Sequence, residues 1–465
     1  MEKNESLPKG WINTTFEKCV EILDGKRIPI NSKERQQRQG KIPYYGATGQ
    51  VGWIDDYLFD EQLVLLGEDG VPFFNNFKNK AYLISGKSWV NNHAHVLKGI
   101  SNLLLNDFLC YYLNQIDYHN YVNGTTRLKL NQTSMKKIPI ILPPLNEQKR
   151  IVEKIEMFYS IIDSFYSTIL ENKMKLELYQ KSFLISILEG KMIEYEKTDL
   201  ENNTLEKITQ SRFLLFEKEI KKNPKKKIQK PPQPIEITEN KFYDCPTDWQ
   251  WTTLNSIIDP YRGITYGVIK LGQDIENGIP CLRTSDVKSL KIETHGVKKI
   301  SKNIADEYKR TYLRGGEVLV NVRGTLGGVC SVPNTLKDYN ISREVAMVPV
   351  LSIIPSDWVS YWISSVASQN WLTGATKGIA YRGINLEDLR NLPICIPPLK
   401  LIPKLISKIE YNFSIIKQFG IYLDLDKSVA KMRSKILQFA FEGKLVPQDP
   451  NDEPASELLK KITLP

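Results

Sequence analysis

The chain has 465 residues and a mass of 53.5 kDa, which excludes a single compact domain because domains usually hold roughly 100–200 residues. Hydrophobic residues make up 41% and charged residues 25%, the proportions of an ordinary globular protein and not of a disordered or collagen-like chain. We find no apolar run near the roughly 18 residues that span a bilayer and no signal-peptide core, so we expect a cytoplasmic protein without a membrane anchor.

The net charge is +10, but more than half of it lies in one segment. Lys218 to Lys230 holds seven lysines and one glutamate, and the other residues carry 56 basic and 52 acidic side chains, which leaves about +4 for the rest of the chain. Bulk charge is therefore weak evidence for nucleic-acid binding. The six cysteines are scattered without a C-x-x-C pair, so we expect neither disulfides nor a metal site.

The first globular segment, residues 1–145, has the short apolar runs and glycine-bearing turns of an α/β domain. Leu63 to Leu66 predicts a strand, and Gly67 to Gly70 predicts the turn that follows it. His93 and His95 alternate as on a strand, but no third metal ligand accompanies them. We therefore expect two packed or hydrogen-bonded histidines.

Residues 146–190 predict one long helix, which enters after Pro143-Pro144 and ends near Gly190. Its apolar residues step by alternate fours and threes, as in the seam of a coiled coil. The seam consists of Ile151, Ile155, Phe158, Ile162, Phe165, Ile169, Leu176, Tyr179 and Phe183. At about 1.5 Å per residue, the part from Ile151 to Ile187 would span on the order of 55 Å.

Residues 191–240 predict a linker between two halves of the chain. A short helix from Leu205 to Ile220 is followed by the lysine-rich run and by Pro231-Pro232-Gln233-Pro234, a composition typical of exposed connectors. Contact of the lysines with phosphates is the alternative.

The remainder of the chain repeats this plan. Leu392 to Glu410 matches Ile138 to Glu156 with eight identities in nineteen positions, at an offset of 254. The Pro-x-x-Trp motif that ends at Trp11 recurs at Trp249, an offset of 238, and the Glu-Gly-Lys that ends at Lys191 recurs at Lys444, an offset of 253. The length difference lies inside the globular parts, which align poorly with each other. We therefore expect two similar helical segments, each of which carries a different globular domain.

The repeat predicts a second globular domain at residues 241–398, with a strand from Glu317 to Val322, then a second long helix at residues 399–444 and a tail at residues 445–465. The seam of this helix consists of Leu405, Ile409, Ile416, Phe419, Leu423, Ala430 and Leu437. Neither helix is stable with such a stripe in water, so we expect the two to pair as an antiparallel coiled coil. The two α/β domains would then lie at opposite ends, related by a pseudo-two-fold axis.

Motifs for catalysis are absent from the sequence. There is no Asn-Pro-Pro-aromatic tetrapeptide and no Phe-x-Gly-x-Gly loop, so the chain is not itself an adenine methyltransferase. The two Glu-Gly-Lys motifs imitate part of a nuclease metal set but lack an upstream Pro-Asp partner, and a glycine cap explains them better. We therefore expect a chain without catalytic residues and without a cofactor of its own.

Two variable domains, each closed by a Pro-Pro-Leu stretch and followed by a helix that ends in Glu-Gly-Lys, resemble the specificity (S) subunit of type I restriction-modification systems. Short sequence motifs inside the first domain, notably Pro43 to Gly49 and Asn91 to His95, are also similar to that family. The resemblance covers essentially the whole chain. It departs where Leu401-Ile402-Pro403 replaces the Asn-Glu-Gln run kept at residues 146–148.

The resemblance implies a non-enzymatic reader whose two target recognition domains each bind one half of a split sequence in double-stranded DNA. It implies that the paired helices act as a ruler and dock two methyltransferase (M) subunits, which carry S-adenosylmethionine and methylate adenine at N6 after flipping the base. Motor-nuclease (R) subunits would join to cleave unmodified DNA. Unlike domains imply unlike half-sites.

Side chains suited to base edges or phosphates are our candidates for DNA contacts. In the first domain they are Lys26, Arg27, Arg35, Arg38, Lys41, Tyr44, Tyr45, Thr48, Gln50, Arg127 and Lys129. In the second domain they are Arg262, Tyr266, Arg283, Thr284, Arg323, Arg343, Lys377, Tyr381 and Arg382. The loops at residues 124–129 and 377–382 are the strongest candidates, because a basic loop recurs there at the same place before each Pro-Pro motif.

Two other functions stay open. A non-catalytic adaptor would use the coiled coil to space two protein-binding domains, although the basic loops favour DNA over this role. A self-sufficient restriction nuclease is disfavoured by the missing metal carboxylates.

Overall fold

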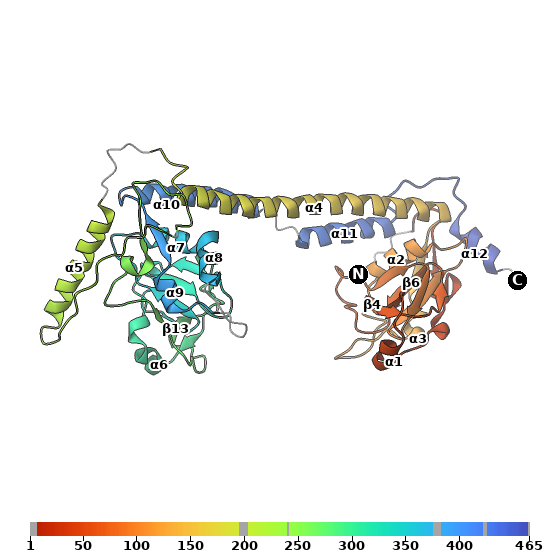
Figure 1. Cartoon of the computed structure of the whole chain (residues 1–465). Coiled ribbons are helices and arrows are strands. Elements are labelled where there is room, and N and C mark those ends of the chain that lie inside the picture. Colours follow the sequence, from red (N-terminus) through yellow and green to blue (C-terminus); the bar gives the residue numbers. More distant parts are fainter. Residues whose placement is uncertain (1–6, 195–202, 240, 375–382, 422–425, 464–465) are drawn as a thin grey trace. The chain divides into compact units, whose positions relative to one another are not determined.

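The computed structural model describes residues 7–194, 203–239, 241–374, 383–421 and 426–463, and Figure 1 labels its elements. The chain forms two compact units. The first unit combines residues 1–171 with residues 422–465, and the second consists of residues 172–421. Among the described helices, none is long and apolar enough to cross a membrane.

The first unit is built around an antiparallel four-stranded sheet whose central strand is buried. The strand order is β2 (Val20–Ile22), β9 (Ala94–Gly99), β6 (Leu63–Gly67) and β7 (Ala81–Ile84). All five residues of β6 are buried, as the apolar run predicts. A second sheet, in the order β4 (Gly49–Ile54), β3 (Ile42–Gly46), β8 (Lys87–Val90) and β5 (Phe59–Asp60), contains the parallel pair β3 and β8. Helix α2 (Asn106–Gln115) packs with five buried residues against the core.

The second unit repeats the main sheet. The order β12 (Thr265–Tyr266), β20 (Val345–Val348), β17 (Val318–Asn321) and β18 (Val329–Ser331) places β17 where β6 lies in the first unit. In both units the first strand of the domain pairs antiparallel with the strand before the Pro-Pro motif: β1 (Ile12–Thr15) with β10 (Pro139–Leu142), and β11 (Gln250–Thr253) with β21 (Pro393–Ile396). The predicted fold class, two α/β domains with long helices and an internal repeat, is confirmed.

The variable part of the second unit differs from that of the first. It contains the three-stranded sheet β16 (Lys299–Ile300), β13 (Ile279–Leu282) and β19 (Asn340–Ile341), and the ribbon β14 (Val287–Lys288) with β15 (Lys291–Ile292). Its helices are α6 (Lys302–Glu307), α7 (Ser356–Ser364), α8 (Val366–Gly374) and α9 (Leu386–Arg390). Trp358 and Trp362 on α7 are fully buried and anchor the core.

Helix α4 (Leu145–Leu188) pairs antiparallel with α11 (Asp426–Phe441) in the first unit. Asp163 forms an ion pair with Arg433, and Tyr166, three residues further along α4, donates to Asp426, seven residues earlier on α11. The opposite direction of the two numberings establishes the antiparallel arrangement.

In the second unit α4 pairs antiparallel with α10 (Ile402–Ile421). Asn412 Nδ2 donates to Tyr179 Oη at 3.2 Å, and Lys408 donates to the carbonyl of Met192. Apolar residues from Phe183 to Leu188 share one core with Leu405 and Ile409.

The seam residues divide into three groups. Those buried are Ile151, Ile155, Ile162, Ile169, Phe183, Leu405, Ile409 and Leu437, and those partly buried are Phe158, Leu176, Ile416 and Ala430. Phe165, Tyr179 and Phe419 are 60%, 50% and 59% exposed, although the hydroxyl of Tyr179 still contacts Asn412 on α10. Leu423 lies outside the described residues. Phe165 is exposed because a straight helix has 3.6 residues per turn and therefore drifts away from a strict repeat of 3.5. At this point of α4 the drift turns the neighbouring Tyr166 toward α11.

The two repeated motifs contact each other across the arms. The helix end at Gly190 packs on Pro246 and Trp249, and the helix end at Gly443 packs on Pro8 and Trp11. Both glycines have φ near +70°, and an added Cβ would approach a proline Cγ to 2.6 Å at Gly190 and 2.3 Å at Gly443. Glycine is therefore required at both helix ends by backbone conformation and by space.

The departure from the Asn-Glu-Gln run, whose counterpart at the offset of 254 is Lys400-Leu401-Ile402, has a structural consequence. Trp11 Nε1 donates to Glu147 Oε2 at 2.9 Å, and both groups are buried. At the offset of 254 the counterpart of Glu147 is Leu401, and Trp249 Nε1 is buried without a hydrogen-bond partner in the described part of the chain. The second arm therefore lacks this side-chain hydrogen bond, and Leu401 and Ile402 pack into the apolar core instead.

The linker is more ordered than its composition predicts. Helix α5 (Thr204–Lys222) packs on the second unit through Arg212, which is 3% exposed and donates to the carbonyls of Asn255 and Ser256. Further along the linker, the carbonyl of Ile235 accepts a hydrogen bond from Thr252 Oγ1 at 2.6 Å. The linker is thus held by hydrogen bonds between a buried guanidinium, a threonine hydroxyl and backbone carbonyls, and a lysine- and proline-rich composition does not predict these contacts. The tail helix α12 (Ala455–Thr463) packs on the first unit in turn, where Ala455 N donates to Gly10 O.

Candidate nucleic-acid interface

In each unit, loops from distant parts of the sequence meet at the C-terminal end of the central strand. At the end of β6 these are residues 24–27, 46–48, 67–71, 91–95 and 123–130. At the end of β17 they are residues 266–268, 283–287, 322–328, 342–344 and 383–384. Because β6 and β17 hold the same place in equivalent sheets, the two loop clusters are equivalent sites.

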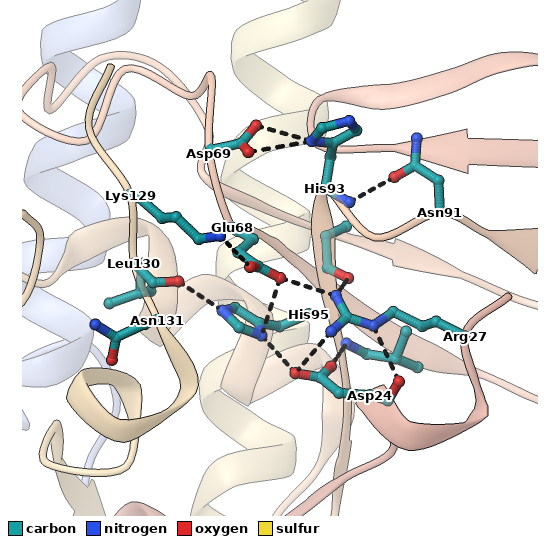
Figure 2. Close-up of polar contacts among 12 residues, drawn as sticks. Asp24, Arg27, Glu68, Asp69, Asn91, His93, His95, Lys129, Leu130 and Asn131 are labelled. Carbon is teal, nitrogen blue, oxygen red and sulfur yellow. Dashed lines mark hydrogen bonds and ion pairs between the residues drawn. The ribbon is translucent and has the colours of Figure 1, made fainter. Parts of the chain in front are cut away.

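A buried histidine organises the first cluster (Figure 2). His95, on β9, is 1% exposed. Its Nδ1 lies 2.6 Å from Asp24 Oδ2, and its Nε2 lies 2.8 Å from the carbonyl of Leu130. His95 thus connects the 3-10 turn at residues 24–26 with the end of the basic loop, as hydrogen-bonded histidines were expected to do.

Two carboxylates hold the basic loop at residues 123–130 against the sheet. Glu68 contacts Lys129 Nζ at 3.0 Å and also Arg27 Nη1 at 3.0 Å. Asp69 contacts Arg127 Nη2 at 2.6 Å (Figure 2 shows both carboxylates). The side chains of Arg127 and Lys129 remain 64% and 55% exposed, so the loop is fixed while its cations stay available at the surface.

His93 lies on the rim of this cluster. Its Nδ1 is 3.0 Å from Asp69 Oδ1, its backbone N–H donates to Asn91, and its side chain is 44% exposed (Figure 2). No group of three or more metal-ligating side chains exists among the described residues.

The pKa of the Asp24 carboxyl lies below its ordinary value. Burial alone would raise the pKa, but the hydrogen bond and attraction of His95, the Val96 N–H at 2.8 Å and the charge of Arg27 favour the carboxylate and outweigh burial. Asp24 is therefore a fixed negative charge at the centre of the cluster.

A buried amide organises the second cluster. Asn321, the last residue of β17, is 1% exposed, and its Nδ2 reaches three backbone carbonyls of neighbouring loops. Around it, the guanidinium of Arg323 lies 5.4 Å from the centre of the Tyr266 ring, and Arg323 bridges to Gly383 at the end of the second pre-helix loop. Arg343 Nε contacts the Glu344 carboxylate at 3.3 Å and stays half exposed.

The candidates for DNA contact fall into five sets, one of which is Arg262 alone, against Glu317 at the start of β17. The end of β6 gathers Lys26, Arg27, Tyr45, Thr48, Arg127 and Lys129, and the end of β17 gathers Tyr266, Arg283, Thr284, Arg323 and Arg343. Arg35, Arg38, Lys41, Tyr44 and Gln50 lie instead on or beside the β3–β4 ribbon. Lys377, Tyr381 and Arg382 lie outside the described residues.

Three of these candidates do not offer a free side chain. Tyr44 is 1% exposed, with its hydroxyl near the carbonyl of Ile30 and Arg35 over its ring. Arg27 is 14% exposed between Asp24 and Glu68, and Arg262 is 14% exposed against the buried carboxylate of Glu317 at 2.7 Å. Glu68 and Glu317, which are far from these arginines in the sequence, bind them, so the structure places all three candidate side chains inside the domains and not at a free surface.

The side chains that build the two clusters were not among the candidates. Glu68, Asp69 and Asn321 are acidic or neutral, and a search for basic and aromatic side chains passes over them. The signal available in the sequence was their position, directly after the apolar runs that became β6 and β17.

Residues 8–172 match the family model of the type I restriction modification DNA specificity domain. The chain is 28% identical over 353 residues to the type I restriction enzyme EcoBI specificity subunit of Escherichia coli, an alignment that covers 73% of this chain and 67% of that protein. It is 22% identical over 470 residues to the EcoDI specificity subunit of Escherichia coli, covering 98% of this chain and 95% of that protein.

A solved chain from a study of complex assembly and conformational transition of the type I R-M system has a similar fold. Its TM-score is 0.62 at 15% sequence identity, and the alignment covers 94% of this chain and 99% of that chain.

Proposed function

We propose that the chain is a specificity subunit of a type I restriction-modification system, as its similarity to such subunits supports, and that it reads an asymmetric, two-part DNA sequence and docks two adenine-N6 methyltransferase subunits on its helices. It is the non-catalytic subunit of the complex, S-adenosylmethionine belongs to the methyltransferase subunits, and motor-nuclease subunits complete the assembly for cleavage. The complex acts on chromosomal DNA in the cytoplasm.

The observation that supports two-part reading is the pair of equivalent clusters with unlike chemistry. Where the first cluster holds Glu68 and Asp69 after its central strand, the second holds Arg323. Arginine pairs best with guanine O6 and N7. In the first cluster Glu68 and Asp69 instead hold the basic loop, whose Arg127 and Lys129 are the exposed cations. Each domain therefore reads its own half-site, and the two halves of the target differ.

The observation that supports two docked methyltransferases is an apolar stripe repeated on both arms. In the first unit Met157, Ile161 and Phe165 are 41%, 56% and 60% exposed. Their spacing of four residues places them along one face of α4, about 120° from the seam at Ile155. An exposed row of large apolar side chains marks a surface for a protein partner.

The second unit presents two of the three stripe positions as exposed residues at the offset of 254, while the counterpart of Ile161, Ile415, is partly buried. Met157 corresponds to Tyr411, which is 70% exposed, and Phe165 corresponds to Phe419, which is 59% exposed. Two equivalent surfaces fit two copies of one partner. The helix α4 of 44 residues, about 66 Å long at 1.5 Å per residue, would serve as the ruler between the half-sites.

The test is a genome-wide map of N6-methyladenine in cells with and without this gene. We expect a two-part motif with a fixed gap that is methylated only when the gene is present. A map that does not change, or a motif without a gap, would contradict the proposal and favour an adaptor role.

A further inference from the structure

The side-chain amide of Asn321 connects two loops of the second cluster. Its Nδ2 lies 3.3 Å from the carbonyl of Thr284, 3.0 Å from that of Val287 and 3.1 Å from that of Thr325. The first two carbonyls belong to the loop at residues 283–287, and the third belongs to the loop at residues 323–328. One buried amide thus sets the distance between two segments that are about forty residues apart in the sequence.

The loops joined by Asn321 carry three partly exposed candidates for DNA contact: Arg283, Thr284 and Arg323. The two loops touch, since a Cβ added to Gly324 would lie 3.8 Å from Thr284 Oγ1. Arg283 is further oriented by Asp286, whose Oδ2 accepts from the Arg283 backbone N–H at 2.8 Å. A change in the separation of the loops would therefore displace Thr284 relative to Arg323.

Gly328 makes the close approach of the second loop possible. A Cβ added at this position would lie 2.2 Å from Asn321 Nδ2 and 2.4 Å from the carbonyl of Val287. Any larger residue must push the loop away from the amide. Asn321 N also donates to Gly328 O at 2.8 Å, so the two residues hold the loop from both ends.

The amide oxygen of Asn321 is buried and has no hydrogen-bond partner in the described residues. A buried polar atom without a partner lowers stability, so this side chain is not the best choice for stability alone. Its three carbonyl contacts give a defined geometry instead.

We propose that Asn321 is a positioning residue for sequence reading by the second domain: it fixes the loop with Arg283 and Thr284 against the loop with Arg323. The inference rests on the proposed function and adds to it a residue that touches no DNA itself. Small displacements of reading groups weaken discrimination between bases more than they weaken contacts to phosphates.

The experiment uses the complete complex of this chain with its methyltransferase subunits, and duplexes whose two half-sites are varied one base at a time. Asn321→Ala removes the three contacts, and Gly328→Ala displaces the loop while the amide is kept. We expect both variants to lose about tenfold or more in preference between the correct and an incorrect base of the second half-site. The preference at the first half-site should stay within about twofold.

Asn340→Ala is the matched control. Asn340 is equally buried, lies in the same unit, and donates from Nδ2 to the carbonyls of Ala305 and Tyr308 at 3.4 and 3.5 Å, neither of which belongs to the two loops. A merely structural role predicts equal effects for the two asparagines, whereas the proposal predicts a change of base preference for Asn321 only. Thermal unfolding of each variant separates lost reading from lost folding, and Gly328→Ala carries the test if Asn321→Ala does not fold.

Unchanged base preference in folded Asn321→Ala and Gly328→Ala complexes would overturn the inference, as would an equal loss with Asn340→Ala. In these cases the wild-type complex still prefers its two half-sites, so the proposed function stands. A wild-type complex without preference at either half-site would overturn the proposed function and the inference with it.

Discussion

Replacement of Phe165 by alanine removes the most exposed side chain of the α4 stripe, at 60% exposure. A phenylalanine buries roughly 200 Å², so about 120 Å² is left for a partner to cover. At about 25 cal/mol per Å² this area corresponds to roughly 3 kcal/mol of binding free energy. Alanine keeps part of the surface, so we expect a loss of about 2 kcal/mol, roughly thirtyfold in the Kd of one methyltransferase subunit.

The repeat makes this prediction specific. Phe165→Ala and Phe419→Ala should each weaken one of two binding steps, and the double variant should weaken both, as measured by titration calorimetry and by the subunit ratio in native mass spectrometry. The free energy of unfolding should change by less than about 0.5 kcal/mol, because both rings are exposed. Leu214→Ala on α5, where the side chain is 64% exposed, is the control. Single variants that keep two methyltransferases at unchanged Kd would refute the reasoning.

Three further predictions concern the first unit. Glu68→Gln removes the charge that holds Lys129, so we expect about 1–3 kcal/mol lower stability in urea unfolding and weaker base preference at the first half-site only. The pKa of Asp24 is depressed in the folded state. Its contribution to the free energy of unfolding is therefore complete above the unfolded pKa of about 3.9 and is lost as the pH falls through the lower folded pKa. Asp24→Asn should reduce this loss of stability at acid pH. Gly443→Ala should lower stability by about 1–3 kcal/mol, whereas Gly25→Ala, with open space around it, should change it by less than about 0.5 kcal/mol in the same thermal assay.

The sequence was sufficient to predict the structural features that depend on the internal repeat or on a local period of apolar residues. The duplicated motifs predicted equivalent domains, and their pairing now has a reason, because each Glu-Gly-Lys helix end packs on the Pro-x-x-Trp motif of the other arm. The apolar run at Leu63 to Leu66 predicted a buried strand, because a central strand is covered on both faces.

Features that depend on contacts between distant segments were not predictable. Arg27 and Arg262 look like surface cations until the partners Glu68 and Glu317 are known. The seam placed Phe165 in the helix pair because a strict heptad ignores the drift of the helix. The sequence marks Asn321 only by its position after an apolar run and does not reveal its role, because that role depends on the three carbonyls that the fold brings to its side chain.

The most direct test of the account compares N6-methyladenine maps from cells that carry the wild-type chain, Glu68→Gln or Asn321→Ala. The two substitutions lie at equivalent strand ends of different domains, so the account predicts that each relaxes one half of the methylated motif and that the halves differ. Relaxation of the same half by both substitutions, or of neither half by two folded variants, would contradict the claim that each cluster reads its own half-site.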